Sequence, residues 1–133
     1  MDIDPNFRQE NVVSGRVVAA AVEVHKTLGG PGLLESVYAE ALEWELKARG
    51  CRVEREKPVP IQYKGQTLST PLRLDMLIDD LVIVECKATT QFNDVFKAQT
   101  LTYLRLTGLR LGVIVNFGEK LVKRGIYRMV NKL

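Results

Sequence analysis

The chain has 133 residues, 46% of them hydrophobic and 26% charged, and its formal net charge is +3. A chain of this length and apolar content is predicted to form a single globular domain, residues 1–133, with a buried core. No apolar run is long enough to span a bilayer, and the segment Met1 to Pro5 is acidic, unlike a secretory signal peptide. We therefore expect a cytoplasmic protein without a membrane partner.

Charge is unevenly distributed along the chain. Residues 1–60 contain 8 Lys/Arg and 10 Asp/Glu, a net of −2, whereas residues 61–133 contain 11 and 6, a net of +5. From Lys97 onward, Glu119 is the only acid among eight basic residues. A basic C-terminal third suits a polyanionic partner such as nucleic acid, and the alternative is an ordinary solvated face.

The two cysteines, Cys51 and Cys86, lack the spacing of a zinc site. Both fall in apolar strand patterns. We expect them to be ordinary buried thiols and not a disulfide.

Two helices are predicted in the first third of the chain. Apolar residues recur at helical spacing over 9–28, and a Gly-Gly-Pro-Gly turn ends this helix. The only histidine, His25, faces inward there, either as a hydrogen-bonded core residue or as a site residue. A second helix is predicted from Leu33 to Arg49, with Glu35 at the N-terminal end of its core-facing stripe, as a helix-dipole partner or a metal-site acid.

The remaining elements are mainly strands. Two short strands, 52–56 and 59–63, precede a Lys64-Gly65 turn, and their prolines indicate an edge or irregular strand. After the central pair at 72–88 come a helix over 93–107, a strand over 109–117 and a last strand over 121–130. This order predicts an α/β fold whose central mixed sheet is flanked by helices.

The central strand pair carries the candidate chemistry. Asp75, Glu85 and Lys87 interrupt otherwise Val/Ile/Leu-rich strands, and buried charges need partners. Because side chains alternate along a strand, Glu85 and Lys87 share one face. Two carboxylates that hold a hard cation, with a lysine to orient water or neutralise charge, suit magnesium-dependent phosphodiester cleavage. A strand-end salt bridge is the alternative.

This hypothesis depends on how the two strands are paired. A two-residue Asp79-Asp80 turn would place Asp75 opposite Val84, so its side chain would point away from Glu85. A three-residue connection, Asp79 to Leu81, pairs Ile78 with Val82 and brings Asp75 opposite Glu85. We therefore predict that longer connection, or a bulge with the same effect.

Short motifs spread over nearly the whole chain resemble those of one known protein family. In chain order they are His25, the Gly32-x-x-Glu35-x-x-Tyr38 segment, Arg73-x-Asp75, Glu85-Cys86-Lys87, Gln99-x-x-x-Tyr103 and Asn116-Phe117-Gly118. Together they are similar to the GxxExxY protein family, a branch of the PD-(D/E)xK nuclease-like superfamily. The resemblance implies a restriction-endonuclease-like core.

The resemblance also implies roles for individual residues. Asp75 and Glu85 would bind Mg²⁺ or Mn²⁺, and Lys87 would assist the attacking water. The further metal ligands that it implies are Glu35, the backbone carbonyl of Cys86, and His25. The residues that it implies for positioning the substrate are Gln99 and Tyr103, similar to the Q-x-x-x-Y motif of RecB-type nucleases, and Arg73.

These observations predict a divalent-metal-dependent phosphodiesterase of nuclease type that acts on DNA or RNA. One alternative is a nuclease-fold module that binds nucleic acid or protein without cleaving it, and another is a hydrolase of small nucleotides. The chain contains no recognisable DNA-reading domain, so a specific substrate would require a homodimer or a partner protein.

Overall fold

The computed structural model describes residues 5–132, so most of the acidic segment Met1 to Pro5 lies outside the described residues. Its largest sheet has five strands in the order β1-β4-β5-β6-β7. Their bounds are β1 Val53–Val59, β4 Leu72–Ile78, β5 Val82–Lys87, β6 Leu111–Asn116 and β7 Ile126–Val130. The β5–β6 pair is parallel and the other pairs are antiparallel, which confirms the predicted mixed sheet.

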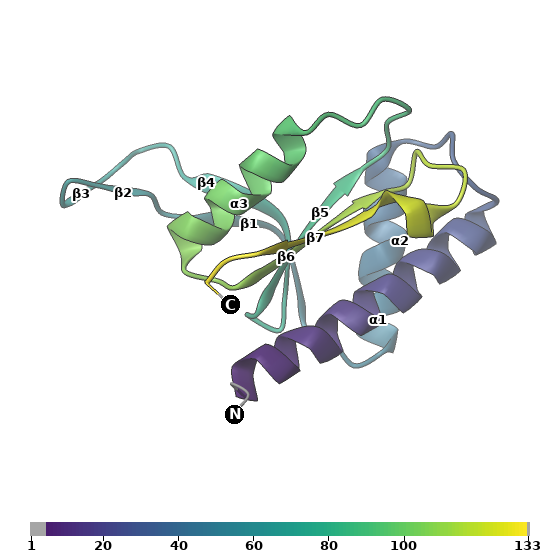
Figure 1. Cartoon of the computed structure of the whole chain (residues 1–133), viewed down its shortest axis with the longest axis horizontal. Coiled ribbons are helices and arrows are strands. Elements are labelled where there is room, and N and C mark those ends of the chain that lie inside the picture. The colour runs from purple at the N-terminus through teal and green to yellow at the C-terminus, as the bar shows by residue number, and fades with distance from the viewer. Residues whose placement is uncertain (1–4, 133) are drawn as a thin grey trace.

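Helices cover both faces of this sheet (Figure 1). On one face lie α1 (Pro5–Leu28) and α2 (Glu35–Ala48), and on the other lies α3 (Val95–Thr107), the crossover between the parallel strands. Burial of apolar side chains from both layers is the main force that holds such a layered fold together. The fold is therefore the predicted α/β class.

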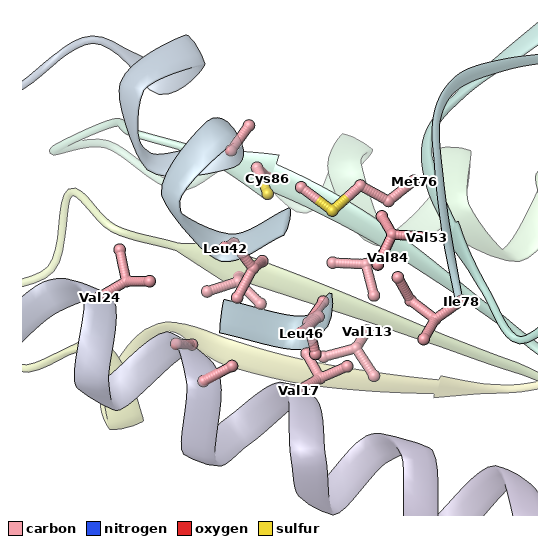
Figure 2. Close-up of a cluster of buried hydrophobic side chains, with 14 of the residues drawn as sticks. Val17, Val24, Leu42, Leu46, Val53, Met76, Ile78, Val84, Cys86 and Val113 are labelled. Atoms are coloured by element: carbon pink, nitrogen blue, oxygen red, sulfur yellow. The ribbon is translucent and has the colours of Figure 1, made fainter. Parts of the chain in front are cut away.

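The larger core lies between the sheet and the α1–α2 layer. Figure 2 shows Val17 and Val24 of α1 and Leu42 and Leu46 of α2 beside strand residues such as Val84. A smaller cluster lies under α3, formed by Leu72, Leu74, Leu77, Ile83 and Leu104. Residues that alternate along β5 therefore belong to opposite faces of the sheet.

Two strand predictions need correction. In place of two strands over 52–56 and 59–63, β1 runs unbroken through Pro58, which an edge strand tolerates, and a separate hairpin follows. That hairpin pairs β2 (Gln62–Tyr63) with β3 (Gln66–Thr67) across the predicted Lys64-Gly65 turn.

The predicted last strand, 121–130, begins in the structure with the 3₁₀ turn η1 (Val122–Gly125), so only β7 is strand. The chain here folds closely over the end of β6: a Cβ added to Gly125 would lie 2.5 Å from the Asn116 carbonyl oxygen. Strand pairing with β6 starts only beyond this approach, at Ile126.

Cys51 and Cys86 are both buried free thiols, as predicted. Burial, with the carboxylates of Asp75 and Glu85 adding to it, raises the pKa of the Cys86 thiol well above its ordinary value. A thiol in this environment is inert. Within residues 5–132 no helix has the length and hydropathy that crossing a membrane requires.

Candidate active site

The site lies where β4 and β5 separate. Their ladder pairs Ile78 with Val82 and Met76 with Val84, and continuing it one step would place Asp75 opposite Glu85. At that step the backbone N–H groups bond to carboxylate side chains and not to backbone carbonyls. The Asp75 N–H donates to Glu85 Oε2 at 3.0 Å, and the Cys86 N–H donates to Asp75 Oδ2 at 3.0 Å. The two carboxylates therefore meet at the fork of the strands.

The connection between these strands has the predicted three residues, Asp79 to Leu81. Asp79 and Asp80 adopt left-handed backbone conformations, with φ of 52° and 57°, which aspartate tolerates better than most residues. The turn is tied to the start of β1, because Arg52 N–H donates to Asp79 Oδ1 at 2.7 Å and Asp79 N–H donates to the Arg52 carbonyl at 2.9 Å. The connection itself is closed by the Leu81 N–H, which donates to the Ile78 carbonyl at 2.9 Å. This three-residue connection goes with the register in which Asp75 comes opposite Glu85.

A second irregularity lies on the other side of β4. The β1–β4 ladder pairs Arg55 with Met76 and Lys57 with Leu74, and skips Glu56 and Asp75 between them. The φ of Glu56 is 50°, outside the range of a regular strand. In a regular strand Met76 and Leu74, two residues apart, would lie on the same face of the sheet. Here Met76 packs under α1 and α2, whereas Leu74 packs under α3. Asp75, at the break, can thus turn its carboxylate along the sheet toward β5.

Glu85 is the most perturbed carboxyl group of the site. Its side chain is only 4% exposed, and burial together with the neighbouring Asp75 raises its pKa to about 8. The Asp75 N–H and Lys87 oppose this shift only in part. A buried carboxyl group beside a second carboxylate favours either a bound proton or a bound cation.

Lys87, the last residue of β5, does not neutralise the two carboxylates directly. Its Nζ lies over the ring of Phe96 on α3, 4.6 Å from the ring centroid. No ion pair within 4.0 Å joins Lys87 to Asp75 or Glu85 among the residues that the structure describes. The alternative of a strand-end salt bridge is therefore not what the structure has.

Glu35 approaches the same fork from the opposite layer. It is the first residue of α2, and partial burial and the proximity of Asp75 raise its pKa, while Lys87 lowers it. Glu35 and Asp75 both line a small hollow of about 110 Å³. The sequence analysis overlooked two other charged residues of this hollow, Arg55 and Glu56. Their place in β1, the strand that pairs with β4, was the feature that could have indicated them.

The three residues assigned to substrate positioning differ in how close they lie to the fork. Burial and the nearby Glu85 and Asp75 raise the pKa of Tyr103, which places its hydroxyl near the carboxylates. Gln99, one turn earlier on α3, is exposed. Arg73 is also exposed, and its guanidinium donates to the Glu56 carbonyl at 3.4 Å.

His25 is not brought to the carboxylates. It is buried, its Nε2 lies 3.2 Å from the Phe117 carbonyl oxygen, and it packs near the stacked rings of Tyr38 and Phe117. It also lines a different cavity, at the C-terminal end of α1. In the structure His25 is thus a buried, hydrogen-bonded residue, and its part in a metal site stays a prediction.

Two of the recognised motifs brace the site. The Tyr38 hydroxyl donates to the Gly30 carbonyl at 2.6 Å and accepts the Leu33 N–H at 3.2 Å, which ties the turn before α2 and so places Glu35. At the end of β6, the Asn116 side chain bonds the N–H and the carbonyl of Thr89, each at 3.0 Å. This second contact holds the chain just beyond Lys87.

The donor set fits a divalent cation in part. Within residues 5–132, no group of three or more His, Cys, Asp and Glu side chains lies close enough to hold a metal ion together. Asp75 and Glu85 are nevertheless adjacent oxygen donors with no cationic partner within ion-pair distance in the described chain. Hard cations such as Mg²⁺ take one or two carboxylates and complete their shell with water and substrate phosphate.

Three comparisons with known proteins were made for this chain. A family model described as the PD-(D/E)XK nuclease superfamily matches residues 11–129. A search of curated proteins and a search of solved structures each returned no match. The matched region contains each residue that the sequence analysis assigned to the site, from His25 to Tyr103.

Proposed function

Because the chain belongs to the PD-(D/E)XK nuclease superfamily, we propose that it is a divalent-metal-dependent phosphodiesterase that cleaves nucleic acid. Family membership supports a nuclease-type activity in general. The observation that supports the finer proposal is the fork of β4 and β5, where Asp75 and Glu85 meet and neither forms an ion pair with any residue that the structure describes. Such a pair is costly to keep in a fold unless a cation uses it.

In this proposal Asp75 and Glu85 hold the cation, with the Cys86 carbonyl at the same strand position as a further oxygen donor. Nucleases of this superfamily typically use Mg²⁺ or a similar divalent cation. The bound cation would supply a polarised phosphate and a more acidic water. Glu35, at the start of α2, has its pKa raised by Asp75 and would hold water on the side of the helix.

Lys87 has the role of orienting the attacking water and neutralising the charge that develops on the phosphate. It rests over Phe96 and forms no ion pair within residues 5–132, so it can move toward a bound phosphate without breaking one. Tyr103 would contact the substrate from α3. Gln99, one turn earlier on the same helix, and the exposed Arg73 of β4 would help to position it.

Replacement of Lys87 by methionine tests this assignment. Methionine keeps most of the apolar contact with Phe96 and removes the ammonium, so we expect the folded variant to lose at least about 100-fold in cleavage rate. The rate would be measured on single-stranded and double-stranded DNA and RNA with Mg²⁺ and with Mn²⁺. The same change at Lys97, whose Nζ lies 4.7 Å from the Tyr127 ring centroid, is the matched control.

One observation favours a second candidate, a nuclease-fold module that binds nucleic acid without cleaving it. Within residues 5–132 no group of three acidic, His or Cys side chains is close enough to hold a metal ion, and Lys87 rests on an aromatic ring. If this is the function, Asp75→Asn should leave nucleic-acid binding intact and no divalent cation should yield products. Metal-dependent products from the wild type that Lys87→Met fails to form would exclude it.

A further inference from the structure

A sizeable cavity lies outside the carboxylate site. It has a volume of about 760 Å³, within the range typical of ligand sites. Its walls come from the C-terminal end of α1, the glycine turn that follows, and the segment 120–124. We refer to it as the basic cleft, because its polar lining is dominated by Lys26, Lys120, Lys123 and Arg124.

Among the described residues these four cations have no anionic partner within ion-pair distance. None of them forms an ion pair within 4.0 Å in the part of the chain that the structure describes, and the lining contains no carboxylate. All four side chains are exposed. Like charges gathered around one hollow repel each other, and an anion that enters relieves the repulsion.

The cleft also has an apolar part. Val22 and Leu121 line it, and Leu121 is 56% exposed although it is a large aliphatic residue. A cluster of cations beside aliphatic surface suits a ligand that carries both phosphate and an apolar group, as every nucleotide unit does. A simple inorganic anion would leave the apolar part unused.

The basic cleft and the carboxylate fork lie at the same end of the sheet. His25 lines the cleft, and its ring bonds the Phe117 carbonyl, while the Phe117 N–H donates to the Lys87 carbonyl at 2.8 Å. The rings of His25, Phe117 and Tyr38 thus link the cleft to the elements of the fork. Phe117 is bonded to the end of β5, and Tyr38 lies one helical turn after Glu35 on α2. One strand of nucleic acid could contact both sites.

We propose that the basic cleft binds the phosphates of a nucleic-acid strand whose reacting phosphodiester lies at Asp75 and Glu85. The proposal rests on the proposed function and adds a second contact to it. It explains how so small a chain would retain a polymer. Each phosphate that the cleft neutralises releases counterions, so affinity would depend steeply on salt.

The test is equilibrium binding in EDTA, where no cleavage occurs, with fluorescently labelled single strands of DNA and RNA. The double variant Lys123→Gln/Arg124→Gln removes two cleft charges. The matched control, Arg105→Gln/Lys132→Gln, removes two charges from a basic pocket beside the C-terminal end of α3, away from the fork. Thermal melting verifies that both variants fold.

We expect the cleft variant to bind at least about tenfold more weakly and its slope of log K against log salt to fall by between about 1 and 2, with the control unchanged. Equal losses in both variants, no loss in the cleft variant, or no binding by the wild type would overturn the proposal.

Cleavage by the wild type with Mn²⁺ is scored separately. Cleavage without a selective loss of affinity in the cleft variant would overturn the cleft alone. A selective loss of affinity without any cleavage would overturn the proposed function and leave the cleft as a binding surface.

Discussion

At the scale of single residues, an ionised Glu85 lowers the stability of the metal-free folded protein. Glu85 is buried beside Asp75, and its pKa rises to about 8 because a charge there is poorly solvated and repelled. A carboxyl group whose folded pKa is raised binds a proton more tightly in the folded state than in the unfolded state. Its contribution to stability is therefore present at low pH. It is lost as the pH rises from the unfolded pKa, 4.5, to about 8.

The raised pKa of Glu85 predicts how the free energy of unfolding depends on pH. In EDTA, the free energy of unfolding of the wild type should fall between about pH 4.5 and pH 8 by on the order of a few kcal/mol from Glu85. Glu85→Gln should lack this fall and be the more stable protein at pH 8. Urea denaturation across this pH range measures both curves.

Glu43→Gln serves as the control for this experiment. The pKa of Glu43 is lowered by hydrogen bonds and ion pairing with Lys47 and Arg55, so its contribution has the opposite sign and is lost at low pH. A Glu85→Gln curve that runs parallel to the wild type would contradict the raised pKa.

At the scale of elements, two sets of hydrogen bonds hold in place the ends of the helix and strand that carry Glu35 and Lys87. The Tyr38 hydroxyl fixes the turn before α2, and the Asn116 side chain fixes the chain after β5 to the end of β6. The Asn116 brace depends on Gly118. A Cβ added there would lie 2.2 Å from the Thr89 carbonyl oxygen, and backbone atoms cannot yield as a flexible side chain can.

We therefore predict that Gly118→Ala destabilises the protein by about 1–3 kcal/mol, because one of the two backbone segments must shift. The matched control is Gly15→Ala in α1, where an added Cβ meets no atom within 4 Å. Alanine there should stabilise the helix by about 0.5–1 kcal/mol. Thermal denaturation of the two variants measures opposite changes in melting temperature. If both changed in the same direction, the close approach at Gly118 would not be the cause.

At the scale of the whole molecule, a cation that binds only the folded state links the site to global stability. Bound at a free concentration of about 100 times its Kd, one ion would stabilise the protein by about 2.7 kcal/mol. We predict that Mn²⁺ or Mg²⁺ raises the melting temperature of the wild type, and that Asp75→Asn removes the increase. Differential scanning calorimetry at matched ionic strength measures the effect.

The control variant is Asp79→Asn, which removes the same charge just beyond the C-terminal end of β4. Its left-handed backbone conformation suits asparagine as well. Cation stabilisation that survives in Asp75→Asn, or that disappears equally in Asp79→Asn, would count against a site at the fork.

The sequence predicted much of this architecture because its signals are local. Helical periodicity identified α1 and α2, and alternation separated Glu85 and Lys87 from the core residue Cys86. The superfamily is confirmed, and the three-residue connection with its register is confirmed by the structure. The finer GxxExxY assignment stays a resemblance, and the single domain and the roles of the individual site residues stay predictions.

Other features depended on contacts between distant segments. Local chemistry allowed two registers for β4 and β5, and the structure has the one in which the Asp75 N–H bonds Glu85 and the Cys86 N–H bonds Asp75 across the two strands. The break at Glu56 and Asp75 involves two strands at once, so no periodicity within one strand could predict it. The same holds for η1, whose course depends on its close approach to the end of β6.

The sequence by itself thus determined which residue types the site contains, because charges placed in apolar strands are visible in one dimension. Only the tertiary structure decided which of them meet. It brought Asp75 and Glu85 to one fork and Glu35 beside them, and it directed His25 to the Phe117 carbonyl at the wall of the basic cleft. Convergence depends on the register and packing of separate elements, which burial of the whole core selects.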